Sequence, residues 1–409
     1  MSAAGTTKGN SLNQSPGDDL LPRFGRRLRV GMVGGGLDSI IGQTHLLALR
    51  MDGYFEISAG AMSIDRAVAM ASGQALLLDK DRIYTDWQVM AEQESSRADG
   101  IDVAVIATPP ASHAEIAQAF LRAGIDVICE KPMTISLAQA DDVVEAVENS
   151  RRAFMLTHCY TGYPMVREAK ALVAAGCVGS VKLVEGLFAS GEPGLLNDPA
   201  DSANRHWRFK SEATGAHRAS VLLEIGTHLH NVAEFVSGIS VKDVSAGLTT
   251  VAPRRDVYDN AYLTVGFEGG AQGRLWSSYV AAGREHGLEL HIYGDEGSLH
   301  WKQESPEYLW RLAPGLPAER VSRALDGTSV ISRAATRVRP GHPEGYLAAF
   351  ANLYRDYARG LLARSLGDDT AATYLSNLPD ARAGRRTMAL IDAACTSDTE
   401  NGARVELRI

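Results

Sequence analysis

Short apolar runs alternate with segments of helical period over the first 160 residues. The apolar runs occupy residues 28–33, 55–62, 101–107, 126–129 and 154–157. Apolar side chains recur every three to four positions in the segments 43–50, 67–75 and 113–123. Unbroken apolar runs are typical of strands buried on both faces, and strands that alternate with helices form parallel sheets. The pattern predicts an α/β fold whose first domain is a doubly wound parallel sheet.

After about residue 151 the pattern changes. A helix is predicted at 166–175, and strands at 181–189, 244–251, 261–267, 273–280, 288–293 and 298–302. Several of these strands alternate apolar and polar residues, which is typical of a sheet with one packed face. The turn Gly294-Asp295-Glu296-Gly297 predicts a hairpin. Late helices are predicted at 346–362 and 382–394, packing back against the first domain.

This division gives a first domain at 26–150 and a second domain at 151–409. Residues 1–25 are rich in Gly, Ser, Asn and Thr, and we expect a disordered tail. The chain of 409 residues is long enough for two cores. No signal-peptide core or membrane-spanning run is evident, and the four cysteines show no metal or disulfide spacing. We therefore expect a cytoplasmic protein without a metal site.

The net charge bears on the partners of the protein. At pH 7 the formal net charge is −8, and the sequence pI is about 5.8. The chain as a whole therefore offers no basic footprint for nucleic acid.

A glycine turn follows the first apolar run. Gly34 and Gly36 occupy the first two positions of a G-x-G-x-x-G fingerprint, but Ser39 replaces the third glycine. Gly42 could take that role after a three-residue insertion. Such a turn lets the backbone approach a pyrophosphate that rests on the next helix N-terminus. The turn, with Leu37, predicts a dinucleotide site.

The end of the second predicted strand bears on the choice of cofactor. Ser63 and Arg66 could accept the 2′-phosphate of NADP, whereas Asp65 would repel it. We expect NAD, with NADP left open.

Polar residues follow the third and fourth predicted strands. Thr108 and Pro109 follow residues 101–107, and Lys131 follows 126–129 within Glu130-Lys131-Pro132. Ligands bind beyond the carboxyl ends of such strands, where the glycine turn also lies. The convergence predicts a nucleotide-dependent redox enzyme.

These motifs together resemble the Gfo/Idh/MocA family of sugar and inositol oxidoreductases. They are Gly34-x-Gly36, Gly42-x-x-His45, Ala107-Thr108-Pro109-x-x-x-His113 and Glu130-Lys131-Pro132, and they place Glu130 and His113 beside the cofactor. The resemblance covers roughly residues 28 to 360. It implies an N-terminal Rossmann domain and a C-terminal domain built on an open, mostly antiparallel sheet. The free face of that sheet supports oligomer contacts in the family, so we expect a homo-oligomer, a dimer or a tetramer.

The resemblance also implies catalytic residues. The family pattern Asp-x-Gly-x-His corresponds to Glu224-Ile225-Gly226-Thr227-His228, with glutamate where aspartate is usual. His228 would act as the general base, Lys131 would polarise the reacting hydroxyl, and Glu224 would orient His228 or bind a neighbouring hydroxyl.

Substrate-binding residues are expected in two places. His158, Tyr160 and Tyr163 follow the strand at 154–157, and the open alternative is that the tyrosines are core residues. The basic cluster at 205–210, with Arg205, Trp207 and Arg208, is either a solvated loop or a pocket for an anionic sugar.

The predicted function is hydride transfer between nicotinamide and a ring secondary hydroxyl of a sugar, glycoside or cyclitol. One alternative is an NAD-dependent glycoside hydrolase that works by transient oxidation and elimination. A second alternative is a catalytically silent sugar or nucleotide sensor.

Overall fold

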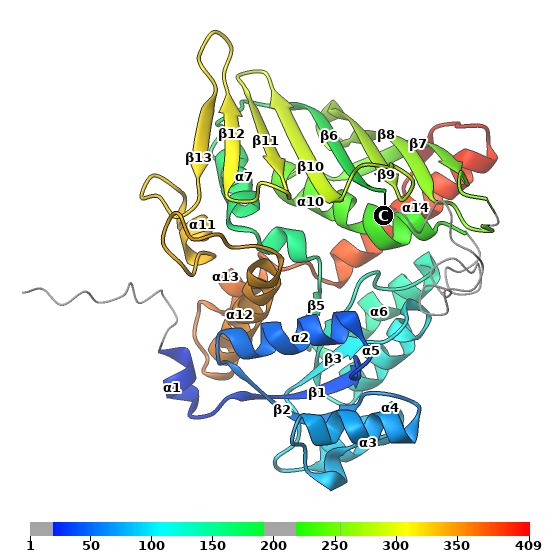
Figure 1. Cartoon of the computed structure of the whole chain (residues 1–409), viewed down its shortest axis with the longest axis vertical. Helices are drawn as coiled ribbons and strands as arrows, with labels where there is room; N and C mark the ends of the chain where they lie inside the picture. The colour runs from blue at the N-terminus through cyan, green and yellow to red at the C-terminus, as the bar shows by residue number, and fades with distance from the viewer. Residues whose placement is uncertain (1–18, 192–217, 254) are drawn as a thin grey trace, which may run out of the picture.

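The computed structural model of the chain describes residues 19–191, 218–253 and 255–409. It contains two sheets joined by helices (Figure 1). The N-terminal elements are α1 (Leu20–Phe24), β1 (Leu28–Gly34), α2 (Ile40–Met51), β2 (Phe55–Ala61), α3 (Arg66–Ala75), α4 (Trp87–Ser96), β3 (Val103–Ala107), α5 (His113–Arg122), β4 (Asp126–Cys129), α6 (Leu137–Ser150) and β5 (Phe154–Leu156). All five strands pair in parallel, in the order β2-β1-β3-β4-β5.

The second group of elements begins after β5. It contains the short helix η3 (Cys159–Gly162), α7 (Pro164–Ala174), β6 (Val181–Ser190), the π-helical turn η5 (Leu222–Gly226), α10 (Thr227–Ser237), β7 (Val241–Thr249), β8 (Asn260–Phe267), β9 (Gln272–Ser278), β10 (His286–Gly294), β11 (Ser298–Lys302), β12 (Tyr308–Leu312), β13 (Glu319–Ser322), α11 (Val330–Ala334), α12 (Tyr346–Ser365), α13 (Ala371–Leu375), α14 (Ala381–Thr399) and β14 (Val405–Glu406). The sheet order is β13-β12-β11-β10-β6-β9-β8-β7-β14, and only β6 and β9 pair in parallel.

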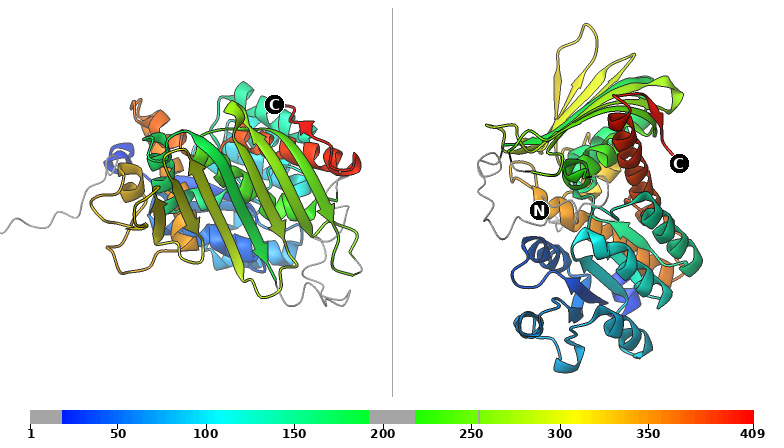
Figure 2. Two further views of the ribbon diagram at one scale, coloured as in Figure 1. Left: turned by 90° about the horizontal axis from the view of Figure 1, so that it is seen from above. Right: turned by 90° about the vertical axis from the view of Figure 1, so that its right-hand side faces the viewer.

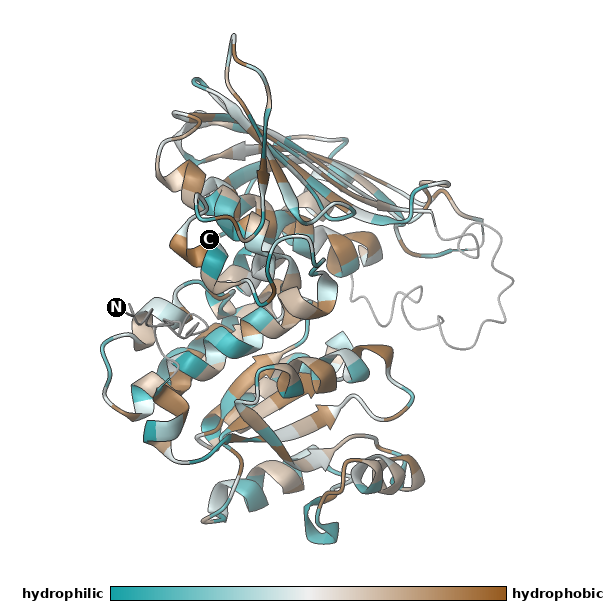
Figure 3. Ribbon diagram, turned by 60° about the vertical axis from the view of Figure 1, so that its left-hand side comes forward, coloured by the Kyte–Doolittle hydropathy of each residue, from teal (hydrophilic) through white to brown (hydrophobic). Residues whose placement is uncertain are grey.

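Burial follows the character of each sheet. Val103 to Ile106 of β3 are fully buried, as expected for a strand covered on both faces. Figure 3 shows apolar residues concentrated along the five-stranded sheet. The nine-stranded sheet packs one face on α7, α10 and α14, whereas in the described residues no helix covers its other face (Figure 2). The predicted fold class is confirmed.

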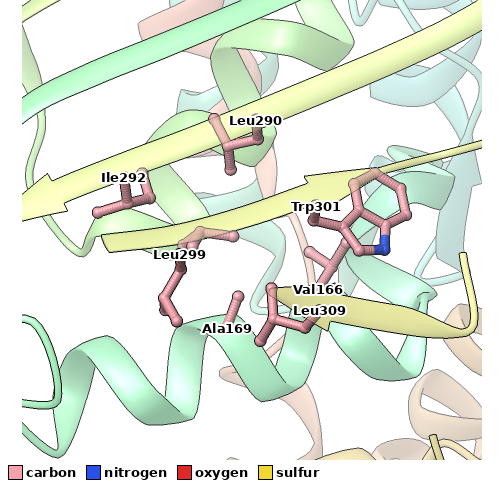
Figure 4. Close-up of a pocket in the computed structure, with 8 residues that line it drawn as sticks. Val166, Ala169, Leu290, Ile292, Leu299, Trp301 and Leu309 are labelled. Carbon is pink, nitrogen blue, oxygen red and sulfur yellow. The ribbon is translucent and has the colours of Figure 1, made fainter. Parts of the chain in front are cut away.

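The core between the nine-stranded sheet and its helices is almost completely filled by side chains. A cavity of about 10 Å³ remains between α7 and β10–β12 (Figure 4). Its lining is entirely apolar and consists of Val166, Ala169, Val236, Leu290, Ile292, Leu299, Trp301 and Leu309. Such a space holds at most about one water molecule and offers it no polar partner, so it is a packing defect of the core.

Helix α12 connects the late part of the chain to the first sheet. It packs against α2, and the hydroxyl of Tyr357 lies 3.0 and 2.8 Å from the main-chain oxygens of Val127 and Ala153, which share its one hydrogen. Arg364 forms an ion pair with Asp126 at the start of β4. The last strands of the parallel sheet are therefore held by a helix that lies about two hundred residues later.

Two features differ from the sequence prediction. Residues 20–24 of the expected tail form α1, because Leu20 is buried and Arg23 pairs with Asp368 at 2.9 Å. Helices α4, α6, α11 and α13 and strands β12, β13 and β14 were not predicted. In the part of the chain that the structure describes, no helix is both long and apolar enough to cross a membrane.

Candidate active site

The glycine turn at the end of β1 is closed tightly from two sides. Gly34 and Gly35 have φ angles of +73° and +69°, which side chains rarely tolerate. A Cβ on Gly34 would lie 2.7 Å from the main-chain oxygen of Ala107. A Cβ on Gly42 would lie 2.3 Å from the main-chain oxygen of Gly35. Gly42 therefore supplies the close helix packing that the missing third glycine would give, as the sequence suggested.

Helix α2 begins directly beside this turn. Ser39 caps the helix, and its hydroxyl accepts a hydrogen bond from the N–H of Gly42 at 3.0 Å. The N–H of Leu37 donates to Ser72 at 3.2 Å. A glycine turn against a helix N-terminus supplies the backbone N–H groups and positive dipole that a diphosphate needs. The residues present therefore fit the diphosphate of a dinucleotide.

The residues that we predicted to bear on the choice between NAD and NADP lie just after β2. They are Ser63, Asp65 and Arg66. The Asp65 carboxylate accepts hydrogen bonds from Ala67 N and Val68 N, at 2.7 and 3.1 Å, and so caps α3. Ser63 accepts one from Asp65 N at 3.1 Å. Arg66 is exposed. The Asp65 carboxylate is thus held as the N-cap of α3, four residues after the end of β2.

Lys131 lies on the loop after β4 and reaches across to the second group of elements. Its Nζ donates to the main-chain oxygen of Glu224 at 3.0 Å and lies 3.5 Å from Glu224 Oε2. Both side chains are partly buried, at 17% and 12% exposed. The glutamate that replaces the expected aspartate is therefore paired with the lysine.

His113 and Glu130, which we predicted beside the cofactor, point into the protein. His113 is buried, and its Nδ1 and Nε2 each lie 2.8 Å from a main-chain oxygen, of Pro132 and Thr108 respectively. A neutral imidazole donates to only one of them at a time, and burial lowers the pKa of His113. His113 joins the two loops instead of presenting a nitrogen to a ligand. The Glu130 carboxylate is also buried.

His228 lies in the first turn of α10, which follows the π-helical turn η5 directly. Its Nδ1 lies 3.3 Å from Nδ1 of His158. The ring of Tyr160 meets it edge-on at 4.9 Å between centroids, and Phe188 packs at 6.3 Å. A π-turn shifts the helical register, and such turns are frequent at functional sites.

Both histidines are kept neutral by their surroundings. Burial, followed by the charge of Lys131, holds the pKa of His228 well below its usual value. The same two causes lower the pKa of His158 to about 3. At neutral pH, the pair therefore carries one proton per ring, and one ring donates to the other.

The remaining predicted substrate residues have different outcomes. Tyr160 and Tyr163 are each 3% exposed, and Tyr163 packs between Tyr160 and Trp301. Neither tyrosine therefore offers an open face for sugar stacking, because core aromatic rings already cover them. Arg205, Trp207 and Arg208 lie outside the described residues. In the described ranges, no group of three or more His, Cys, Asp or Glu could hold a metal ion.

Sequence reasoning gave no role to three residues beside this site. His45 and Thr157 contact Glu130, and Tyr354 contacts His45. His45 was visible as part of the motif Gly42-x-x-His45. Nothing in the sequence marks Tyr354 as its partner.

The depressed histidine pKa values predict acid sensitivity. Unfolded histidines take up a proton near pH ~6.5, whereas folded His228 does not, so stability falls as pH drops below that value. Each such histidine contributes up to about 1.4 kcal/mol per pH unit. The variant His228→Asn should therefore show a shallower loss of unfolding free energy between pH 6.5 and 5. Urea unfolding across this range measures the slope. The variant His342→Asn, at an exposed position, is the control, and equal slopes in His228→Asn and wild type would contradict the prediction.

Comparison with known proteins adds two family matches. Residues 28–158 match the model of an oxidoreductase family with an NAD-binding Rossmann fold. Residues 166–300 match the model of the GFO/IDH/MocA C-terminal domain. Both halves of the candidate site thus fall within matched segments.

Individual relatives match over most of the chain. An uncharacterized oxidoreductase, YfiI of Bacillus subtilis, is 30% identical over 93% of this chain and 97% of its own length. Levoglucosan dehydrogenase of Pseudarthrobacter phenanthrenivorans is 27% identical over 78% of this chain and 82% of its own. The crystal structure of an inositol dehydrogenase homolog from Azotobacter vinelandii, complexed with NADH and myo-inositol, is 31% identical and has a TM-score of 0.85. It covers 94% of this chain and 98% of that one.

Proposed function

This chain belongs to the Gfo/Idh/MocA family of NAD-binding oxidoreductases, and we propose that it transfers a hydride between NAD and a ring secondary hydroxyl of a sugar, glycoside or cyclitol. The convergence of Lys131, Glu224 and His228 from separate elements is the observation that carries the proposal. Relatives named for levoglucosan and scyllo-inositol support the substrate class.

The residues divide the chemistry among them. Bound NAD would accept or return the hydride. The ammonium of Lys131 donates a hydrogen bond to the reacting oxygen and stabilises the negative charge that develops there. Nε2 of His228 takes the hydroxyl proton, while its Nδ1–H donates to His158. Glu224 holds the ammonium of Lys131 through its main-chain oxygen and its carboxylate.

A panel of substrates tests this function. Purified full-length protein is incubated with NAD and, in turn, levoglucosan, myo-inositol, scyllo-inositol and D-xylose, and NADH formation is followed at 340 nm. We expect turnover of at least one ring polyol, with NAD preferred over NADP. Release of an aglycone from an aryl glycoside without NADH accumulation would instead support the glycoside hydrolase. Nucleotide binding without turnover of any compound would support the sensor.

We also propose a homo-oligomer formed through the free face of the nine-stranded sheet. On this face, Tyr262 of β8 is 56% exposed and stacks on Trp276 of β9, with ring centroids 5.8 Å apart, and Leu183 of β6 is 50% exposed. Apolar and aromatic groups that a partner can cover stabilise such contacts.

The variant Tyr262→Glu should therefore shift the protein to smaller species, because it places a charge in the contact. Light scattering coupled to size-exclusion chromatography measures the mass. The control Val330→Glu, at a residue of α11 that is 68% exposed, should keep the wild-type mass. A monomeric wild type, or an unchanged mass in Tyr262→Glu, would contradict this proposal.

A further inference from the structure

The carboxylate of Glu130 lies in a closed polar site next to Lys131. Glu130 is 5% exposed. Its Oε2 accepts a hydrogen bond from the main-chain N–H of Lys131 at 3.0 Å, and its Oε1 accepts one from the hydroxyl of Thr157 at 2.5 Å. The backbone of Lys131 is therefore attached to a buried acceptor.

His45 of α2 is the third neighbour of this carboxylate. It is fully buried, and its Nε2 lies 3.3 Å from Glu130 Oε1, close enough for attraction although the N–H is not aligned with the oxygen. Its Nδ1 lies 2.5 Å from the hydroxyl of Tyr354 on α12. Because a carboxylate can only accept, Nε2 of His45 carries the proton. Nδ1 then accepts from Tyr354, and the protonated Nε2 faces Glu130 at 3.3 Å.

This arrangement keeps a negative charge inside the protein. Burial acts to raise the pKa of Glu130, but the contact with His45, the charge of Lys131 and the Thr157 hydroxyl together hold it below its usual value. Groups with titratable side chains that face Glu130 from the surrounding elements are His45, His113, Cys129, Lys131, His158, Cys159, Tyr346 and Tyr354. Without His45, protonation of Glu130 would become easier, and a protonated carboxyl is a weaker acceptor for the Lys131 N–H.

We propose that Tyr354 and His45 are positioning residues that act through Glu130 to set the position of Lys131 beside Glu224. The proposal rests on the proposed function for its kinetic consequence, because Lys131 polarises the reacting hydroxyl there. It also links α12, late in the chain, to the catalytic lysine of the first sheet.

Two substitutions of His45 separate its two contacts. In His45→Asn the side-chain amide takes the place of Nδ1 and remains a partner for Tyr354, but no atom of residue 45 contacts Glu130. In His45→Gln the amide nitrogen replaces Nε2 and still reaches Glu130. We expect His45→Asn to lower kcat about tenfold and His45→Gln to stay within about threefold of wild type. The acid limb of the kcat profile should move to higher pH only in His45→Asn, because Glu130 then protonates more easily.

A matched control exists on α10. His230 also bridges a hydroxyl and a buried glutamate, with Thr387 at 2.9 Å and Glu234 at 3.2 Å. His230→Asn removes a comparable contact from a site that does not hold Lys131, so it should leave the acid limb in place. Wild-type kcat and pH profile in His45→Asn, or equal damage in His45→Gln, would overturn the proposal.

A measurement without substrate keeps the two proposals distinguishable. Acetylation of Lys131 by acetic anhydride is followed by mass spectrometry, with exposed Lys302 as internal reference. The ratio of Lys131 acetylation to Lys302 acetylation should rise severalfold in His45→Asn. If that variant does not fold, the same rise is expected in Tyr354→Phe, which deletes one hydroxyl. An unchanged ratio would overturn the positioning role. If no sugar or cyclitol is turned over, the proposed function fails while this ratio still decides the placement of Lys131.

Discussion

Replacement of Lys131 by methionine should lower kcat by about a thousandfold and leave NAD binding nearly unchanged. The ammonium of Lys131 contacts Glu224, and methionine keeps an unbranched side chain, one heavy atom shorter, but removes the charge and the donors. Stopped-flow absorbance at 340 nm measures kcat, and quenching of tryptophan fluorescence measures the Kd of NAD. The loss should appear in kcat more than in the KM of the substrate, because the lost interaction strengthens in the transition state.

A charge-preserving variant sharpens this test. Lys131→Arg keeps the positive charge but replaces a compact ammonium with a planar fork that does not fit a site built for one point donor. It should recover only a small part of the activity. Lys302→Met, at a side chain that is 56% exposed, serves as the control and should match wild type. A Lys131→Met enzyme with kcat within tenfold of wild type would remove the lysine from the proposed chemistry.

Replacement of Gly42 by alanine should weaken NAD binding by at least about tenfold. The added Cβ would lie 2.3 Å from the oxygen and 2.5 Å from the Cα of Gly35, and both are backbone atoms that cannot rotate away. Helix α2 would have to move off the glycine turn, which separates the two parts of the diphosphate cradle. Isothermal titration calorimetry with NAD measures the change.

The control for this variant is another glycine-to-alanine change. A Cβ on Gly247 of β7 would meet nothing within 4 Å, so Gly247→Ala should keep the wild-type Kd. Circular dichroism verifies that both variants are folded. Wild-type NAD affinity in Gly42→Ala would show that the close approach of the turn and α2 is not needed for the cofactor.

The sequence predicted those structural features that depend on residues close together in the chain. The strand β3 is apolar throughout, so its burial on both faces was visible in the sequence. Gly42 was identified because helix packing against a glycine turn needs a residue without a side chain. The π-turn η5 and the pairing of Glu224 with Lys131 were not predicted, because the replacement of aspartate by glutamate does not say which neighbour the longer side chain reaches.

Contacts between distant segments were beyond sequence reasoning. His113 was expected beside the cofactor, but its two main-chain partners lie on different loops that only the folded sheet brings together. Tyr160 and Tyr163 show the same limit, since a tyrosine after a strand suits either a ligand pocket or a core. Phe188, which packs on Tyr160, comes from the next strand of the chain, whereas Trp301, which packs on Tyr163, comes from β11, much later in the chain.

The contacts of α12 have a consequence for the order in which the chain leaves the ribosome. The strands β4 and β5 emerge long before Tyr357, whose hydroxyl binds the oxygens of Val127 and Ala153. His45 likewise emerges 309 positions before Tyr354. During synthesis, polar groups of the five-stranded sheet therefore lack their native partners on α12. They gain these partners only when nearly the whole chain has been translated. The N-terminal half of the protein is synthesised first, but it is among the last parts to gain all its native contacts.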